Sequence, residues 1–254
     1  MFDLTGRVAV VTGGSSGIGV QFAKALAEQG ADVVIIARRM DKLETVAEEV
    51  RKTGRKCLPI AADLTKADDI KKAVAEIVEK CGKIDILVNN AGTSAVAPAE
   101  SMTDEEWNRV VELNLDSVFF VAREFGKVMI ENKYGRIINI ASMYGLVGSN
   151  NPDVPTVVYH ATKGGVVNLT RALAAEWAKY NITVNAICPG FFPSEMTQGL
   201  FDTKEFQDYL KMTTPMGRGG REGELNPALI YLASDEAGYT TGSMVVVDGG
   251  TTAI

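Results

Sequence analysis

The segment Arg7–Gly19, RVAVVTGGSSGIG, decides the fold of this 254-residue chain. Its first part, Arg7–Thr12, is a short β-branched apolar run that predicts a buried strand. A helical pattern over Gly17–Gln29 begins inside the glycine-rich turn that follows. Glycines allow the tight turn, and the helix N-terminus favours an anion, so a strand, turn and helix in this order predict a phosphate site.

The same alternation of strand and helix continues along the chain. Further strands are predicted at Asp32–Ala37, Cys57–Ala61, Ile84–Asn89, Arg136–Ala141, Ile182–Ile187 and Met244–Asp248. Further helices are predicted at Asp41–Lys52, Lys66–Lys80, Asp104–Met129, Pro155–Lys179 and Leu225–Ala233. Nearly continuous apolar strands between helices predict an α/β fold of the Rossmann type, a doubly wound parallel sheet of about seven strands with helices on both faces. No linker divides the chain, so we expect a single domain over residues 1–254.

Composition excludes several kinds of function. The net charge is −6 with no basic stripe, so nucleic acid is not an expected partner. No apolar run is long enough to span a bilayer, and the N-terminus runs straight into a strand without a signal peptide. The cysteines lack zinc-like or CxxC spacing, which favours free thiols and a cytoplasmic location. With one histidine and no carboxylate cluster, we expect no metal site.

Chemistry-bearing residues follow the predicted strands, at the sheet edge where such folds bind ligands. Arg38 and Arg39 come directly after the second strand, where a carboxylate would otherwise bind the ribose of NAD. A guanidinium there suits the additional 2′-phosphate of NADP. The pair therefore favours NADP over NAD, although two arginines at a helix start can also be simply solvated.

A tyrosine and a lysine, Tyr159 and Lys163, lie four positions apart on one predicted helix face. A tyrosine normally titrates near pH ~10, and a neighbouring positive charge lowers its pKa. The pair therefore indicates a tuned acid/base. The spacing alone is common, but Ser142 at the end of an upstream strand and the glycine turn strengthen the interpretation.

Together these residues resemble the short-chain dehydrogenase/reductase family, and the resemblance covers the whole chain. The motifs that carry it are Thr12–Gly19, Asn89–Gly92, Asn114, Ser142, Tyr159 with Lys163, and Pro189-Gly190. Within the family the chain looks most like gluconate 5-dehydrogenases and related sugar or polyol oxidoreductases. Two segments carry that finer likeness, Gly135–Met143 and Asn185–Thr197.

The resemblance implies a catalytic tetrad. Tyr159 would be the acid/base, and Lys163 would lower its pKa and hold the nicotinamide ribose. Ser142 would hydrogen-bond the substrate oxygen, and Asn114 would support a water relay through Lys163. The reaction implied is hydride transfer between a nicotinamide and a secondary alcohol or ketone.

The resemblance also implies a set of cofactor contacts. Asp63 would meet the adenine amino group, and Ser194 stands where many relatives have a threonine near the nicotinamide carboxamide. The full expected set is Thr12, Gly13, Ser15, Ser16, Gly17, Ile18, Gly19, Arg38, Arg39, Asp63, Leu64, Asn90, Ala91, Gly92, Tyr159, Lys163, Pro189, Gly190, Phe192 and Ser194.

The substrate side leaves alternatives open. A cap is expected at residues 191–212, and its aromatic residues also suit a 3-oxoacyl carrier-protein reductase or a hydroxysteroid dehydrogenase. A catalytically inactive NADP-binding regulator is the alternative of a different class. Ser142 and Tyr159 are 17 positions apart, more than in many relatives, and we expect the extra residues, around 149–155, to lie beside the substrate entrance. Asn150, Asn151 or Asp153 is a hypothetical substrate contact there. The family resemblance and the apolar C-terminal segment favour a homotetramer.

Overall fold

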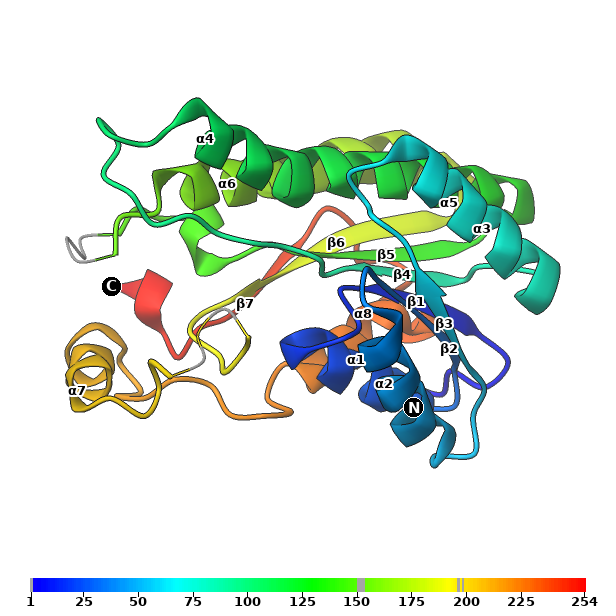
Figure 1. Cartoon of the computed structure of the whole chain (residues 1–254). Coiled ribbons are helices and arrows are strands. Elements are labelled where there is room, and N and C mark those ends of the chain that lie inside the picture. Colours follow the sequence, from blue (N-terminus) through cyan, green and yellow to red (C-terminus); the bar gives the residue numbers. More distant parts are fainter. Residues whose placement is uncertain (1, 150–153, 196, 198) are drawn as a thin grey trace.

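The computed structural model describes residues 2–149, 154–195, 197 and 199–254, which form a parallel sheet between two layers of helices (Figure 1). The sheet has seven strands in the order β3-β2-β1-β4-β5-β6-β7. Their bounds are β1 Val8–Thr12, β2 Asp32–Ala37, β3 Cys57–Ala61, β4 Ile86–Asn89, β5 Gly135–Ile140, β6 Ile182–Pro189 and β7 Met244–Val247. Every pair of neighbouring strands is parallel, as the apolar runs predict.

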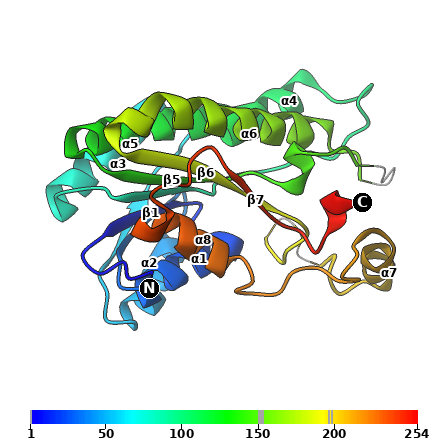
Figure 2. The ribbon, with the colours of Figure 1, turned by 180° about the vertical axis from the view of Figure 1, so that it is seen from behind.

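The helices separate consecutive strands and cover both faces of the sheet. Their bounds are α1 Gly17–Glu28, α2 Met40–Arg51, α3 Ala67–Cys81, α4 Asp104–Val111, α5 Ser117–Asn132, α6 Val157–Trp177, α7 Lys204–Thr213 and α8 Asn226–Ala233. One face carries α1, α2 and α8, and the other carries α3, α5 and α6; Figure 2 shows the same division from behind. This arrangement is the doubly wound fold that the sequence predicts.

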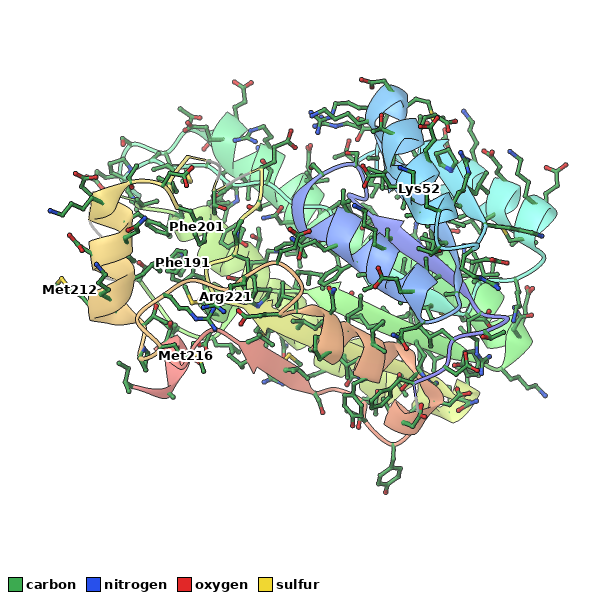
Figure 3. All side chains as sticks on the ribbon, turned by 90° about the horizontal axis from the view of Figure 1, so that it is seen from below. Lys52, Phe191, Phe201, Met212, Met216 and Arg221 are labelled. Atoms are coloured by element: carbon green, nitrogen blue, oxygen red, sulfur yellow. The ribbon has the colours of Figure 1, made fainter. Side chains whose placement is uncertain are left out.

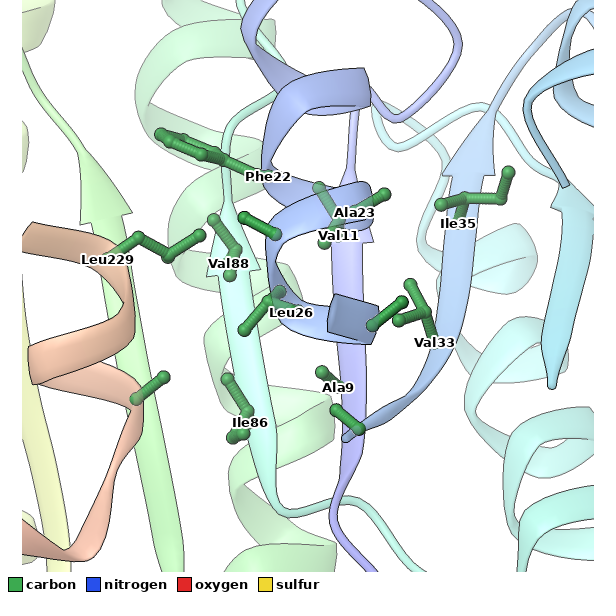
Figure 4. Close-up of a cluster of buried hydrophobic side chains, with 14 of the residues drawn as sticks. Ala9, Val11, Phe22, Ala23, Leu26, Val33, Ile35, Ile86, Val88 and Leu229 are labelled. Atoms are coloured by element: carbon green, nitrogen blue, oxygen red, sulfur yellow. The ribbon is translucent and has the colours of Figure 1, made fainter. Parts of the chain in front are cut away.

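Alternate residues of each central strand pack into two separate hydrophobic cores, one on each face of the sheet. On β1, Ala9 and Val11 join Phe22 and Leu26 of α1 in one core (Figure 4). Val10 faces the opposite way, into the core that contains Ile77, Phe125 and Trp177. Burying both faces of the strand explains why its sequence is continuously apolar rather than alternating.

The sheet order creates a crevice between β1 and β4. β1 pairs with β2 on one side and with β4 on the other, so the chain after β1 and the chain after β4 leave the sheet in opposite directions. Ligands of doubly wound folds bind at this switch point. The fold therefore brings the glycine turn and the segment Asn90–Gly92 to one edge.

One predicted element differs from the structure. The helix expected over Asp104–Met129 is divided by a π-helical segment, Glu112–Asp116, that widens the backbone between α4 and α5. Such π segments occur frequently at functional sites. The region of the expected cap also forms a helix, α7, whose first turn is capped by the Thr203 hydroxyl accepting from the Phe206 N–H at 3.3 Å.

The glycine turn leaves no space for a side chain at Gly19. A Cβ there would collide with the carbonyl of Gly13, a backbone group that cannot move aside. We expect Gly19→Ala to lower the free energy of unfolding by roughly 1–3 kcal/mol, as overpacking does. Urea unfolding measures the change. The control is Gly148→Ala, where an added Cβ meets no atom within 4 Å, and equal stability of the two variants would contradict the prediction.

Candidate active site

Ser142 and Tyr159 reach the site from two neighbouring elements. Ser142 follows β5, where its Oγ accepts a hydrogen bond from the Tyr144 N–H at 3.2 Å and starts a short 3₁₀ turn, Met143–Gly145. Tyr159 lies in the first turn of α6, which returns along β6 and that turn. A hydrogen bond from the Ser142 hydroxyl favours a lower pKa of Tyr159, so the two hydroxyls lie together.

Lys163 lies one helical turn after Tyr159 and is buried. Its Nζ donates to the Ile140 carbonyl at 2.7 Å, so the ammonium is tied to the end of β5. The same Nζ lies 5.5 Å from the centroid of the Tyr159 ring. Burial lowers the pKa of Lys163 to about 8, which still leaves the ammonium mostly protonated at pH 7.

The pKa of Tyr159 is not lowered as expected. Burial raises the pKa of Tyr159 above its ordinary value, and the Ser142 hydroxyl only partly opposes that shift. The reason is desolvation, which disfavours the phenolate more than the hydroxyl contact favours it. Tyr159 therefore stands as a neutral phenol at pH 7, ready to donate a proton.

Asn114 is held rigidly by the π-helical segment. Its Nδ2 donates to the Thr93 carbonyl and its Oδ1 accepts from the Thr93 N–H, both at 2.8 Å. A Cβ built on Gly92 would lie 3.3 Å from Asn114 Oδ1 and 3.8 Å from Lys163 Nζ. Gly92 thus keeps the space where Asn114 and Lys163 approach each other. Thr93, which no sequence signal marked, orients the amide.

The glycine turn leaves the N-terminus of α1 available to an anion. Gly13 and Gly17 have φ of +66° and +55°, a conformation that favours glycine. Among the described residues, no side chain caps α1 and no carboxylate lies in its first turn. The first N–H groups therefore fit an external phosphate.

Thr12 and Asn90 shape this turn from within. Thr12 Oγ1 accepts from the N–H groups of Asn90 and Ala91 at 2.9 and 3.1 Å. Asn90 Nδ2 donates to the Thr12 carbonyl at 3.0 Å. Both side chains hold the ends of β1 and β4 together, so their roles are positional.

The two arginines after β2 are both exposed but differ in their contacts. Arg39 pairs with Glu195, with its nearest nitrogen at 2.9 Å. Arg38 makes no hydrogen bond or ion pair with any residue that the structure describes, and its charge lowers the pKa of Asp63 as a minor contribution beside the Thr65 hydrogen bonds. Arg38 is the guanidinium left available at this edge.

Some of the expected cofactor residues have buried side chains. Leu64 and Phe192 pack in the two cores, which limits them to backbone contacts. Pro189 ends β6, and the Gly190 N–H donates to the Val247 carbonyl at 2.9 Å. Ser194 is the residue expected near the nicotinamide carboxamide. It hydrogen-bonds Thr197, a threonine three positions further along the chain.

An aromatic cluster connects the catalytic turn to α7. Tyr144 stacks on His160, with ring centroids 4.3 Å apart, and meets Phe191 edge to face at 6.0 Å. Phe191 in turn packs edge to face on Phe206 and Tyr209 of α7. Tyr144 was not marked by sequence reasoning, although it stands two residues after Ser142.

A separate cavity of about 510 Å³ lies beyond this cluster, lined by Phe191, Phe192, Arg218 and Asp248 among others. Its lining includes none of Asn114, Ser142, Tyr159 and Lys163. Figure 3 shows Phe191 and Phe201 beside α7, with Met216 further along the chain. Residues 150–153, which include the hypothetical contacts Asn150, Asn151 and Asp153, lie outside the described residues.

Two further findings concern other kinds of site. In the part of the chain that the structure describes, no helix is long and apolar enough to cross a membrane. Nor do the described His, Cys, Asp and Glu side chains gather in a group of three or more that could hold a metal ion.

Comparison with known proteins decides the family. A family model described as Enoyl-(Acyl carrier protein) reductase matches residues 13–252. The chain is 37% identical to gluconate 5-dehydrogenase of Gluconobacter oxydans over 252 residues, which cover 99% of this chain and 97% of that protein. The chain belongs to the short-chain dehydrogenase/reductase family. It is therefore an oxidoreductase that acts on CH–OH groups with a nicotinamide cofactor.

Other members of the short-chain dehydrogenase/reductase family are equally similar. A 3-oxoacyl-[acyl-carrier-protein] reductase of Staphylococcus epidermidis is 39% identical over 245 residues, covering 96% of this chain and 98% of that protein. A crystal structure of gluconate 5-dehydrogenase from Burkholderia cenocepacia, in complex with NADP and tartrate, has a TM-score of 0.93. It is 38% identical and covers 100% of this chain and 98% of that one.

The neutral phenol of Tyr159 carries the proton that we expect the reaction to transfer. We expect Tyr159→Phe to abolish turnover and to leave NADPH binding nearly unchanged, because the ring remains and only the transferable proton is lost. Steady-state kinetics and fluorescence titration measure the two effects. The control is Tyr239→Phe, which removes the hydroxyl of a fully exposed tyrosine. Activity above a few per cent of the wild type would remove Tyr159 from the mechanism.

The buried ammonium of Lys163 generates a second prediction. Its folded-state pKa is depressed from 10.5 to about 8, so the unfolded chain binds more protons between these values and stability rises with pH there. We expect the stability of the cofactor-free wild type, relative to Lys163→Met, to increase by about 2–3 kcal/mol between pH 7 and 10. Urea unfolding of both proteins at each pH measures it. A constant difference would mean that burial does not depress this pKa.

Proposed function

We propose that this protein is an NADP-dependent oxidoreductase that interconverts a secondary alcohol and a ketone on a sugar acid or polyol, as a gluconate 5-dehydrogenase does. The observation that carries the proposal is the convergence of Ser142, Tyr159, Lys163 and Asn114 at the ends of β4 and β5. An acid, a hydroxyl donor and a buried cation at one point are the groups that carbonyl reduction needs.

The chain's own residues account for the proton transfer. In ketone reduction the Tyr159 phenol donates its proton to the carbonyl oxygen, and Ser142 donates a hydrogen bond to the same atom. The raised pKa of Tyr159 keeps that proton in place at neutral pH. The bound nicotinamide supplies the hydride. In alcohol oxidation each transfer runs backwards, with the cation of Lys163 favouring the phenolate.

Lys163 and Asn114 are placed to relay a proton between Tyr159 and the interior of the protein. Lys163 Nζ donates one hydrogen bond, to Ile140, among the described residues, and an ammonium has further protons to share. Asn114 faces it across Gly92. These positions support a proton path from Tyr159 through Lys163 toward Asn114, with water completing it.

Cofactor selection rests on the end of β2. No carboxylate stands directly after Ala37, where arginines take its place, and the exposed Arg38 is available for a 2′-phosphate. Three features of the α1 N-terminus support a dinucleotide beside it: the positive φ of Gly13 and Gly17, the absence of a capping side chain among the described residues, and the lack of an acidic first turn. We therefore favour NADP, with NAD as the weaker cofactor.

The substrate class is supported by relatives and by the polar groups near Ser142. The hydroxyls of Tyr144 and Tyr209 interact, which offers polar groups to a hydroxylated substrate. The aromatic rings of Phe191, Phe201 and Phe206 favour a second candidate, a 3-oxoacyl carrier-protein reductase, because they form an apolar wall. A ketosteroid would fit the same wall. A non-catalytic NADP-binding regulator is disfavoured by the intact tetrad.

A panel of ketones tests the function. Purified protein is assayed with NADPH and with NADH on 5-ketogluconate, a 3-oxoacyl thioester and a ketosteroid. The proposal expects the highest kcat/KM with NADPH and 5-ketogluconate. A higher value with the thioester would favour the second candidate. Turnover of none of them, with NADPH still bound, would favour the regulator.

We also propose one domain over residues 1–254 with a cap at 191–212, a cytoplasmic location and a homotetramer. The thiols of Cys57 and Cys188 are buried and free, which supports a reducing compartment. Val246 of β7 and the terminal Ile254 are 39% and 89% exposed, and symmetric assembly would bury such surfaces. A monomeric mass by light scattering at micromolar concentration would exclude the tetramer.

Arg38 generates a prediction about the cofactor. We expect Arg38→Ala to weaken NADPH binding roughly ten- to a hundredfold and NADH binding much less, because a hydrogen bond to a charged group contributes about 1.5–3 kcal/mol. Calorimetric titration of both cofactors measures it. Lys52→Ala, which removes an exposed cation just after α2, is the control. Equal losses for the two cofactors would mean that Arg38 does not bind the 2′-phosphate.

A further inference from the structure

The carboxylate of Glu195 joins the segment after β6 to the cofactor edge. Ser16 Oγ donates to Glu195 Oε2 at 2.8 Å. Arg39 donates to both oxygens, at 2.9 Å to Oε2 and 3.2 Å to Oε1, and Lys42 Nζ lies 3.2 Å from Oε1. One anion therefore gathers donors from the glycine turn, from the end of β2 and from the start of α2.

The surroundings keep this carboxylate charged and fix its backbone over the turn. Hydrogen bonds from Arg39, Ser16 and Lys42 lower the pKa of Glu195 to about 2, so it is ionised throughout the physiological range. A Cβ built on Gly17 would lie 3.4 Å from Ser194 Cα and 3.5 Å from the Glu195 nitrogen. The segment of Ser194 and Glu195 thus lies directly against the turn that opens α1.

The donors held by Glu195 are those that a phosphate at this edge needs. Ser16 belongs to the glycine turn, and Arg39 adjoins Arg38, the proposed 2′-phosphate ligand. A carboxylate and a phosphate repel each other and compete for the same N–H and O–H groups. Both cannot occupy the set formed by Ser16, Arg39 and Lys42 at once.

We propose that Glu195 is a cofactor-specificity residue, an internal anion that occupies part of the 2′-phosphate site and is displaced when that phosphate binds. The inference rests on the proposed use of NADP. Arg38, which has no bonding partner among the described residues, makes the first contact with the phosphate, and Arg39 joins it when Glu195 leaves. The glutamate therefore weakens ligands that carry a 2′-phosphate and leaves those without one nearly unaffected.

The test compares Glu195→Gln with the wild type by calorimetric titration of the full chain. The probes are NADPH, NADH, 2′,5′-ADP and 5′-AMP. Because the ion pairs are about half exposed, we expect E195Q to tighten NADPH and 2′,5′-ADP about three- to tenfold. NADH and 5′-AMP should change less than twofold. E28Q, which removes an exposed carboxylate at the end of α1, is the matched control and should change none of them.

A second variant locates the effect. In the R39A background, E195Q should tighten 2′,5′-ADP far less than it does in the wild type, because the released guanidinium is missing. Weaker NADPH binding by E195Q, or equal changes with and without the 2′-phosphate, would overturn the inference. This test is distinct from the test of the proposed function. Cofactor preference is measured on the wild type alone, whereas the effect of Glu195 is measured as the ratio of the dissociation constants of E195Q and the wild type.

Discussion

The hydroxyl of Thr12 is the contact on which the site depends. It accepts hydrogen bonds from the N–H groups of Asn90 and Ala91 and donates one to the Val88 carbonyl at 3.3 Å. One buried side chain therefore joins the ends of β1 and β4. These two strands flank the point where the direction of the chain reverses. Together with the β1–β4 ladder, that junction fixes the separation between the glycine turn and Gly92 at one crevice.

Burial determines the electrostatics of the catalytic groups. Tyr159 and Lys163 are pushed toward their neutral forms, the phenol by a raised pKa and the ammonium by a lowered one. Cys188, on the adjacent strand, has its thiol pKa raised to about 11 by the same desolvation. At pH 7 the site therefore holds a neutral phenol at Tyr159 beside an ammonium at Lys163 that is still mostly protonated.

The sequence predicts the sheet almost completely because most of its strands are buried on both faces. Their apolar runs agree with the structure to within about two residues, and the Tyr159–Lys163 spacing correctly predicts one helical face. The π-helical segment at Asn114 and the contacts of the Asn114 amide with Thr93, 21 positions away, were not predicted, because no local pattern in the sequence marks them. The pKa of Tyr159 was misjudged because spacing shows the neighbouring charge but not the loss of water.

Contacts between distant segments account for the other unpredicted features. Glu195 is a single glutamate in a loop, and nothing local marks it as a partner of Arg39, 156 positions earlier. Tyr144 gains its place from stacking on His160, which belongs to the following helix. The first depends on how the segment after β6 folds back over the sheet edge, and the second on how the turn after β5 packs on α6. Both arrangements are set by tertiary packing rather than by local pattern.

The order of the strands has a consequence for how this scaffold diversifies. The proposed phosphate ligands follow β1 and β2, the proposed substrate-facing groups follow β5 and β6, and Glu195 reaches from the second half to the first. Mutations in the segments after β5 and β6 can therefore alter substrate choice and leave the turns after β1 and β2 unchanged. Relatives named for gluconate and for acyl-carrier-protein substrates, at 37% and 39% identity along nearly the whole chain, show that similar chains of this family differ in the substrate for which they are named.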